Sequence, residues 1–146
     1  MQELTKGELD IMDLTEMKKF IGGKGKPSTW EIDRTMNKRF CEAIGDSNPK
    51  WTKEVHPGLL TSAQLMGEAA AMPPFTLPGI VDGGGDWEFF KPIHIGDKLT
   101  IVNEFTGVDD KSNEKRKMLM FSMKSTYTNQ KGEVVAAANG RVMNIG

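Results

Sequence analysis

Residues 40–51 read Phe-Cys-Glu-Ala-Ile-Gly-Asp-Ser-Asn-Pro-Lys-Trp, and this stretch decides the expected fold and site. It joins the end of a predicted helix to a tight turn. Asp33 is a suitable N-cap for that helix, and Gly45 suits the left-handed residue that ends one. Asp46 and Asn48 have side chains that bond their own backbone in turns. The sequence therefore predicts a helix that delivers the Asp46 carboxylate into an ordered turn.

A second predicted helix covers about residues 57–72 and stops before Pro73-Pro74. Apolar residues surround nearly all of it: Leu59, Leu60, Ala63, Leu65, Met66, Ala69, Ala70 and Met72. A helix that is apolar all round is usually buried, so this one is expected at the centre of the protein. A shorter helix is expected over residues 8–20, and a short extended piece around Trp30.

The second half of the chain has the composition of β-strands. Segments rich in β-branched, aromatic and apolar residues cover residues 87–93, 99–106, 118–128 and 134–143. The glycines at 83–85 are expected to form a flexible entry to the first of these strands. A buried helix followed by long antiparallel strands indicates an α+β fold, with one sheet curled around the helix. The length of 146 residues fits one domain, residues 1–146.

Bulk composition excludes several classes of protein. A net charge of -1, without a basic stripe, argues against a nucleic-acid binder. The single cysteine, Cys41, rules out an internal disulfide and suits a reducing compartment. Neither a signal peptide nor an apolar run of membrane-spanning length is visible, so a cytoplasmic protein without membrane contact is expected. No His/Cys cluster has the spacing of a metal site.

Several segments, taken together, resemble the MaoC-like dehydratases, the family of (R)-specific enoyl-CoA hydratases. Besides residues 40–49, these are His-Pro-Gly-Leu-Leu-Thr at 56–61 and Asp-Trp-Glu-Phe-Phe-Lys-Pro-Ile-His-Ile-Gly-Asp-Lys-Leu at 86–99. Residues 127–135 also suit the final hairpin of that family. The resemblance is to the N-terminal-type dehydratase domain and implies a hot-dog fold, an antiparallel sheet wrapped around a long central helix.

The resemblance implies hydration or dehydration of an acyl thioester carried by coenzyme A or acyl carrier protein, with no further cofactor. In such enzymes an aspartate and a histidine hold the reacting water, and backbone N–H groups bind the thioester oxygen. Asp46, Asn48 and Gly58 match the family aspartate, turn asparagine and glycine. Trp51 stands where the family has its histidine, and an indole cannot accept a proton.

His56 is the histidine that could replace the missing base if the short loop before it brings it close to Asp46. Trp51, Asn48, Gly58 and Ser62 are expected to border the substrate. A purely structural role as a turn residue also remains open for Asp46.

Four functions remain open at this point. The leading one is an accessory subunit of an enoyl-thioester hydratase or dehydratase, in a homodimer or a hetero-oligomer with a second hot-dog chain. The others are a self-sufficient hydratase that uses Asp46 and His56, a non-catalytic acyl-CoA-binding protein, and a hot-dog thioesterase, since fold alone does not fix function.

Overall fold

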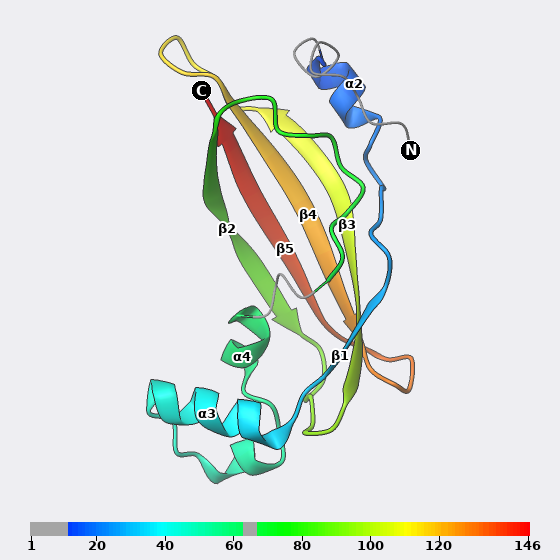
Figure 1. The fold of residues 1–146 in the computed structure, drawn as a ribbon, viewed down its shortest axis with the longest axis vertical. Coiled ribbons are helices and arrows are strands. Elements are labelled where there is room, and N and C mark those ends of the chain that lie inside the picture. Colours follow the sequence, from blue (N-terminus) through cyan, green and yellow to red (C-terminus); the bar gives the residue numbers. More distant parts are fainter. Residues whose placement is uncertain (1–11, 63–66) are drawn as a thin grey trace.

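The computed structural model describes residues 12–62 and 67–146. Its main feature is one antiparallel sheet of five strands in the order β1-β3-β4-β5-β2 (Figure 1). The strands are β1 (Ser28–Glu31), β2 (Gly79–Phe89), β3 (Lys98–Asp110), β4 (Met118–Thr128) and β5 (Val134–Ile145). The predicted strand at 118–128 is confirmed at both ends, and those at 99–106 and 134–143 are confirmed and extend further.

Strand β2 differs most from the prediction, because it begins eight residues earlier than expected, at Gly79 rather than Trp87. The glycines at 83–85 lie inside the strand and not before it. Its register against β5 shifts between Asp82 and Gly85, and Gly84 has a φ of 85°. A β-bulge with a left-handed residue favours glycine, so the glycine run marks a bulge inside a strand.

In the described part of the chain, four short helices precede β2: α2 (Leu14–Lys18), α3 (Arg34–Ile44), the 3-10 helix η1 (Pro49–Thr52) and α4 (Pro57–Ser62). The predicted caps of α3 are confirmed. The Asp33 side chain accepts a hydrogen bond from the Met36 N–H at 2.8 Å, and Gly45 ends the helix with a φ of 73°. The helix predicted over residues 8–20 is shorter, and residues 8–11 lie outside the described part of the chain.

The prediction of a long central helix over residues 57–72 is wrong for its second half. Helix α4 ends at Ser62 in the described chain, and residues 67–72 are not helical. Their backbone bonds to the sheet instead. The Glu68 N–H donates to the Ser28 hydroxyl at 3.1 Å, and the Glu68 carbonyl accepts from the Asn103 amide at 2.9 Å. These long-range bonds, and Pro73, which disfavours helical backbone before it, outweigh the apolar periodicity.

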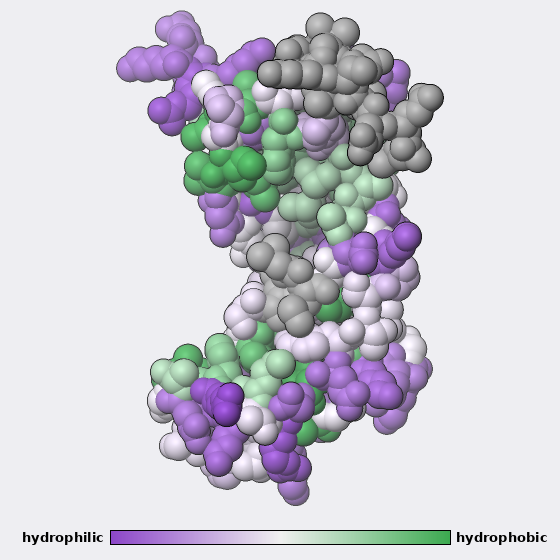
Figure 2. Space-filling view, in the orientation of Figure 1, coloured by the Kyte–Doolittle hydropathy of each residue, from purple (hydrophilic) through white to green (hydrophobic). Residues whose placement is uncertain are grey.

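Two clusters of buried side chains lie on one face of the sheet and form the core. The first joins α3 and α4 to the sheet and contains Trp30, Leu60, Leu99 and Tyr127 among others. The second lies beneath α2 and residues 70–75 and is built around Phe105 and Phe121. Figure 2 shows apolar surface towards both ends of the long axis, with a narrower waist between them. The candidate site lies at the end that carries α3 and α4 (Figure 1).

Candidate active site

Asn37, on the inward face of α3, holds the loop that carries the site. Its side chain is completely buried. Its amide nitrogen donates to the carbonyls of Trp51 at 2.8 Å and Glu54 at 3.0 Å, and its amide oxygen accepts from the His56 N–H at 2.9 Å. Three backbone groups of residues 51–56 therefore find their partner in one side chain. The orientation of Trp51 and His56 is fixed relative to α3.

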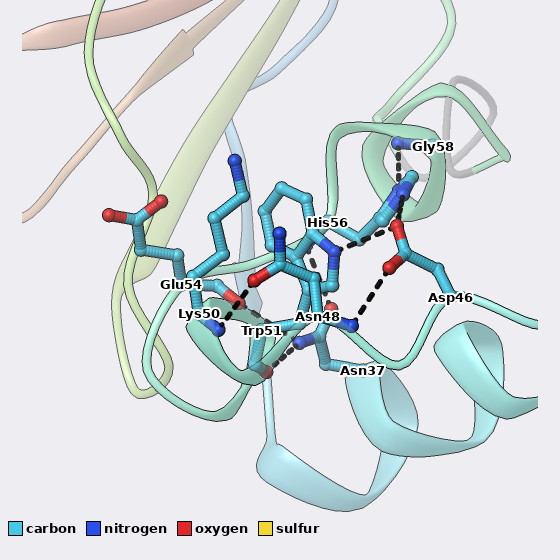
Figure 3. A network of polar contacts seen from close by, with 8 residues as sticks. All are labelled: Asn37, Asp46, Asn48, Lys50, Trp51, Glu54, His56 and Gly58. Atoms are coloured by element: carbon cyan, nitrogen blue, oxygen red, sulfur yellow. Dashed lines mark hydrogen bonds and ion pairs between the residues drawn. The ribbon is translucent and has the colours of Figure 1, made fainter.

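Asp46 is the centre of a polar network at the end of α3 (Figure 3). Its Oδ1 accepts the backbone N–H of Asn48 at 3.0 Å, the Asx-turn bond expected from the sequence. Its Oδ2 accepts the indole N–H of Trp51 at 2.9 Å and lies 3.2 Å from Nε2 of His56. The short loop thus does bring His56 to Asp46, as the sequence hypothesis required.

Both ring nitrogens of His56 are engaged within the chain. The backbone N–H of Gly58 donates to Nδ1 at 2.9 Å, while Nε2 faces Asp46. Because Nδ1 accepts a hydrogen bond, it holds a lone pair, and Nε2 is the protonated nitrogen of the neutral ring. The same bond occupies the Gly58 N–H, the group that the family resemblance assigns to the thioester oxygen.

Trp51 lies between two cavities. Its ring packs against His56 with centroids 4.6 Å apart, and the Lys50 ammonium lies 4.4 Å from the centroid of its ring. A cavity of about 610 Å³ between α3 and the following turn is lined by Trp51 and Asp46 but not by His56. A cavity of about 300 Å³ towards residues 89–93 is lined by Trp51 and His56 but not by Asp46. Each member of the pair therefore borders a different cavity.

The remaining expected site residues divide into two groups. Asn48 and Gly58 belong to the Asp46 network, Asn48 through its backbone N–H and as the N-cap of η1. Ser62 does not reach it, because its hydroxyl donates to the Leu59 carbonyl at 2.7 Å within α4. Sequence reasoning missed Asn37. The sequence did contain a signal, because Asn37 is a polar residue that directly follows the apolar Met36 and precedes Phe40 by three positions.

The Asp46 carboxyl is a weak proton acceptor in this setting. The backbone N–H of Asn48, followed by the Trp51 indole and His56, holds its pKa below the ordinary value of an aspartate. Hydrogen bonds to the ionised form stabilise it. Asp46 is therefore ionised at neutral pH and is a poor donor of a proton to carbon.

This lowered pKa predicts how Asp46 affects stability. A group whose pKa is depressed by folding stabilises the protein above its unfolded pKa, and loses that effect as the pH falls through its folded pKa. Asp46→Asn should therefore be less stable than the unchanged protein at neutral pH. The difference should shrink below about pH 4, where an aspartate in an unfolded chain protonates. Urea unfolding at several pH values measures it, and a difference that stays constant down to pH ~3 would contradict the proposed network.

No group of three or more His, Cys, Asp or Glu side chains in residues 12–62 and 67–146 could hold a metal ion. Over the same ranges, no helix is long and apolar enough to cross a membrane.

Comparison with known proteins supports the fold and the family. The family profile described as FAS1-like, dehydratase domain region, matches residues 19–138. An (R)-hydratase from A. caviae involved in PHA biosynthesis superposes with a TM-score of 0.60 at 18% identity, covering 84% of this chain and 94% of the hydratase. None of the curated proteins matches the sequence.

Two of the similar structures are complexes from Mycobacterium tuberculosis. The HadBC (3R-hydroxyacyl-ACP dehydratase) complex gives a TM-score of 0.59 at 20% identity, covering 85% of this chain and 96% of the other. The ChsH1-ChsH2 complex gives 0.61 at 17% identity, covering 95% and 90%. These likenesses confirm the predicted α+β hot-dog fold, here with a shortened central helix.

Proposed function

Since the chain belongs to the FAS1-like dehydratase-domain family, we propose that it is an accessory subunit of an enoyl-thioester hydratase or dehydratase. A second hot-dog chain supplies the complete Asp/His pair, and this chain shapes the site beside it. The substrate is an acyl thioester of coenzyme A or acyl carrier protein. The observation that carries the proposal is the position of Trp51, bonded to Asp46 and packed on His56.

The chemistry explains why this arrangement argues against independent catalysis. Water must lose a proton as it attacks carbon 3, carbon 2 must gain one, and negative charge builds on the thioester oxygen. Here both nitrogens of His56 are occupied, and the Gly58 N–H is bonded to His56 rather than free for an oxyanion. The lowered pKa of Asp46 reduces its strength as a base. The His56 ring, the Gly58 N–H and the Asp46 carboxylate therefore all have hydrogen-bond partners within the chain.

The two cavities support the same conclusion. A water held by both Asp46 and His56 needs one space that both side chains border. Of the two residues, only Asp46 lines the 610 Å³ cavity and only His56 lines the 300 Å³ cavity, while Trp51 lines both. The Trp51 indole therefore separates the space beside Asp46 from the space beside His56, and a catalytic Asp/His pair would need these to be one space.

The edge of the sheet formed by β2 is the surface through which a partner would join. Among the described residues β2 pairs with β5 alone, and large apolar side chains along and beside it are exposed: Ile80, Val81, Phe89 and Phe90. An unpaired strand edge favours pairing with another chain. Phe89 and Phe90 also line the 300 Å³ cavity beside His56, so a partner at this edge would help to enclose it.

We therefore expect the purified chain to be at least a dimer, as a homodimer or with its partner subunit. Analytical ultracentrifugation at micromolar concentration measures this. Val81→Lys, which places a charge on the exposed β2 edge, should shift the equilibrium towards monomer. A lysine at Val102, a half-buried residue of β3 that pairs with Thr126 of β4 away from the β2 edge, should not. If the unsubstituted chain stayed monomeric even with the partner subunit present, the proposed assembly would be contradicted.

One observation favours a second candidate, a self-sufficient hydratase. The 3.2 Å contact between Asp46 and His56 gives this chain an acid–base pair of its own, although not at the family spacing. If that pair catalyses, the pure chain should turn over crotonyl-CoA, His56→Ala should abolish the activity, and Trp51→His should not improve it.

The accessory role is tested by paired substitutions in the assembled enzyme. Asp46→Ala in this chain should change the hydration rate of crotonyl-CoA little, whereas alanine at the partner's catalytic aspartate should lower it by about 100-fold or more. The opposite ranking would contradict the proposal. Tight acyl-CoA binding without turnover in any assembly would indicate the binding-protein alternative, and thioester hydrolysis would indicate a thioesterase.

A further inference from the structure

An apolar patch lies on the outer face of the sheet, the face opposite the two core clusters. Side chains alternate between the two faces of a strand, so the pairing register shows which of them are neighbours on one face. Two adjacent rows of paired residues make up this surface. The first row is Met120-Met143-Val81 and the second is Met118-Ile145-Gly79, across β4, β5 and β2. Their five large side chains form the outer patch: Val81, Met118, Met120, Met143 and Ile145.

The outer patch departs from the polar pattern of the rest of this face. An antiparallel sheet with one face in solvent normally carries polar residues there. Nearer α3 and α4 the outer face follows this rule, because Glu104, Lys124 and Asn139 are neighbours on β3, β4 and β5. At the other end of the sheet, beside the C-terminus, four patch residues are half-buried and Val81 is 49% exposed (Figure 1). Contiguous apolar surface of this kind marks an interaction site.

Two charged residues of opposite sign continue the rows onto β3. Asp109 pairs with Met120 and therefore extends the first row. The Lys111 N–H donates to the Met118 carbonyl at 2.8 Å, so Lys111 extends the second row. Both residues are exposed, and they lie two positions apart on the same face of the chain. The first row thus begins with an acid and the second with a base.

We propose that the outer patch packs face to face against the outer patch of a second copy of this chain. The two copies are related by a two-fold axis that runs across the strands, between the two rows. The first row of each copy then lies on the second row of the other. Because a two-fold contact uses the same surface on both copies, that surface has to complement itself.

The two rows complement each other in charge, polarity and size. Asp109 of each copy faces Lys111 of the other, so each acid meets a base twice across the interface. In the middle of the rows, the methionines of the first row face apolar side chains of the second. At the β2 end, Val81 faces Gly79, which has no side chain to obstruct it. A partner of unrelated sequence would not explain why acid and base occupy corresponding places in the two rows.

The size of the contact sets its expected strength. Four strands about 4.8 Å apart, each contributing about six residues of about 3.4 Å, cover roughly 400 Å² per copy. This is about half of the area that a standard stable interface buries on each partner, so the association should be weak and concentration-dependent in the micromolar range. It goes beyond the proposed function, and it would join two dimers formed through the β2 edge into a tetramer.

Sedimentation equilibrium of the full chain, from low to high micromolar concentration, tests the proposal. The mass of the particle present at the lowest concentration should double as the concentration rises. Met120→Lys should raise the dissociation constant of this step at least about 100-fold, because it places an unpaired charge in the apolar contact. Thr126→Lys, at a half-buried position on the polar part of the same face of β4, should leave the step unchanged. Near-ultraviolet circular dichroism establishes that both variants are folded.

Charge reversal tests the two-fold arrangement itself. Asp109→Lys should weaken the doubling about tenfold, because each new lysine faces Lys111 of the second copy. Adding Lys111→Asp to that variant exchanges the two charges and should restore the original dissociation constant. A double variant no tighter than Asp109→Lys alone would overturn the arrangement.

The remaining outcomes separate this contact from the β2 edge. Val81 belongs to both surfaces, whereas Met120 lies on β4, inside the sheet. If Val81→Lys dissociates the particle and Met120→Lys does not, the face-to-face contact is wrong and the β2-edge assembly stands. A chain whose mass never doubles by itself would also contradict the proposal, even if a different protein covered the outer patch.

Discussion

The isolated chain is expected to hydrate crotonyl-CoA at least about 100-fold more slowly than the assembled enzyme with its partner subunit. Loss of one group from a coupled acid–base pair removes at least this much of the catalysis that such pairs provide. In this chain the His56 nitrogens and the Gly58 N–H are bonded to each other or to Asp46, so none is free for substrate. The decrease in enoyl-thioester absorbance gives the rate directly.

The comparison needs a control for folding and binding. The isolated chain should keep the near-ultraviolet circular dichroism bands of packed aromatic side chains under the assay conditions, which establishes that it is folded during the assay. A rate for the pure chain equal to that of the assembled enzyme would contradict the accessory role. Catalysis would then be assigned to the Asp46–His56 pair of this chain, and loss of activity in His56→Ala would establish that assignment.

Asn37→Ala is expected to lower the free energy of unfolding by about 3–4 kcal/mol, the largest effect of any single polar substitution in the site. Its side chain is the partner of three backbone groups, the carbonyls of Trp51 and Glu54 and the N–H of His56. Each buried group left without a partner costs about 1–3 kcal/mol, and partial access to water reduces the sum. Urea denaturation with linear extrapolation measures the change.

Asn139→Ala is the matched control for that experiment, because it makes the same substitution at an exposed position of β5. Surface changes of this kind usually alter stability by less than about 0.5 kcal/mol. If Asn37→Ala and Asn139→Ala differed by no more than this, Asn37 would not be the residue that holds the loop in place.

Local signals allowed the first half of the site to be predicted from sequence. The Asp33 cap, the left-handed Gly45 and the Asx turn at Asp46 all depend on residues within a few positions of each other. The turn therefore forms as expected and places the Asp46 carboxylate at the end of α3. The contact between Asp46 and His56 was also among the hypotheses, because the loop between them is short.

Long-range bonds account for what the sequence could not predict. The periodicity of residues 57–72 indicates a helix, but the Asn103 amide and the Ser28 hydroxyl capture the backbone of Glu68 from distant strands. Likewise, Asn37 has no neighbour in sequence that reveals its three partners, which are 14 to 19 residues away. The glycine run at 83–85 suggested flexibility, because nothing local distinguishes a bulge inside β2 from a loop before it.

The closed network of Asp46, Trp51, His56 and Gly58 is the central claim, and nitrogen-15 NMR of the His56 ring tests it most directly. Long-range proton–nitrogen spectra identify which ring nitrogen carries the proton. The network predicts the tautomer with its proton on Nε2, facing Asp46, and a lone pair on Nδ1, facing the Gly58 N–H. A ring protonated on Nδ1, with Nε2 free to accept a proton from water, would contradict it and would favour catalysis by this chain alone.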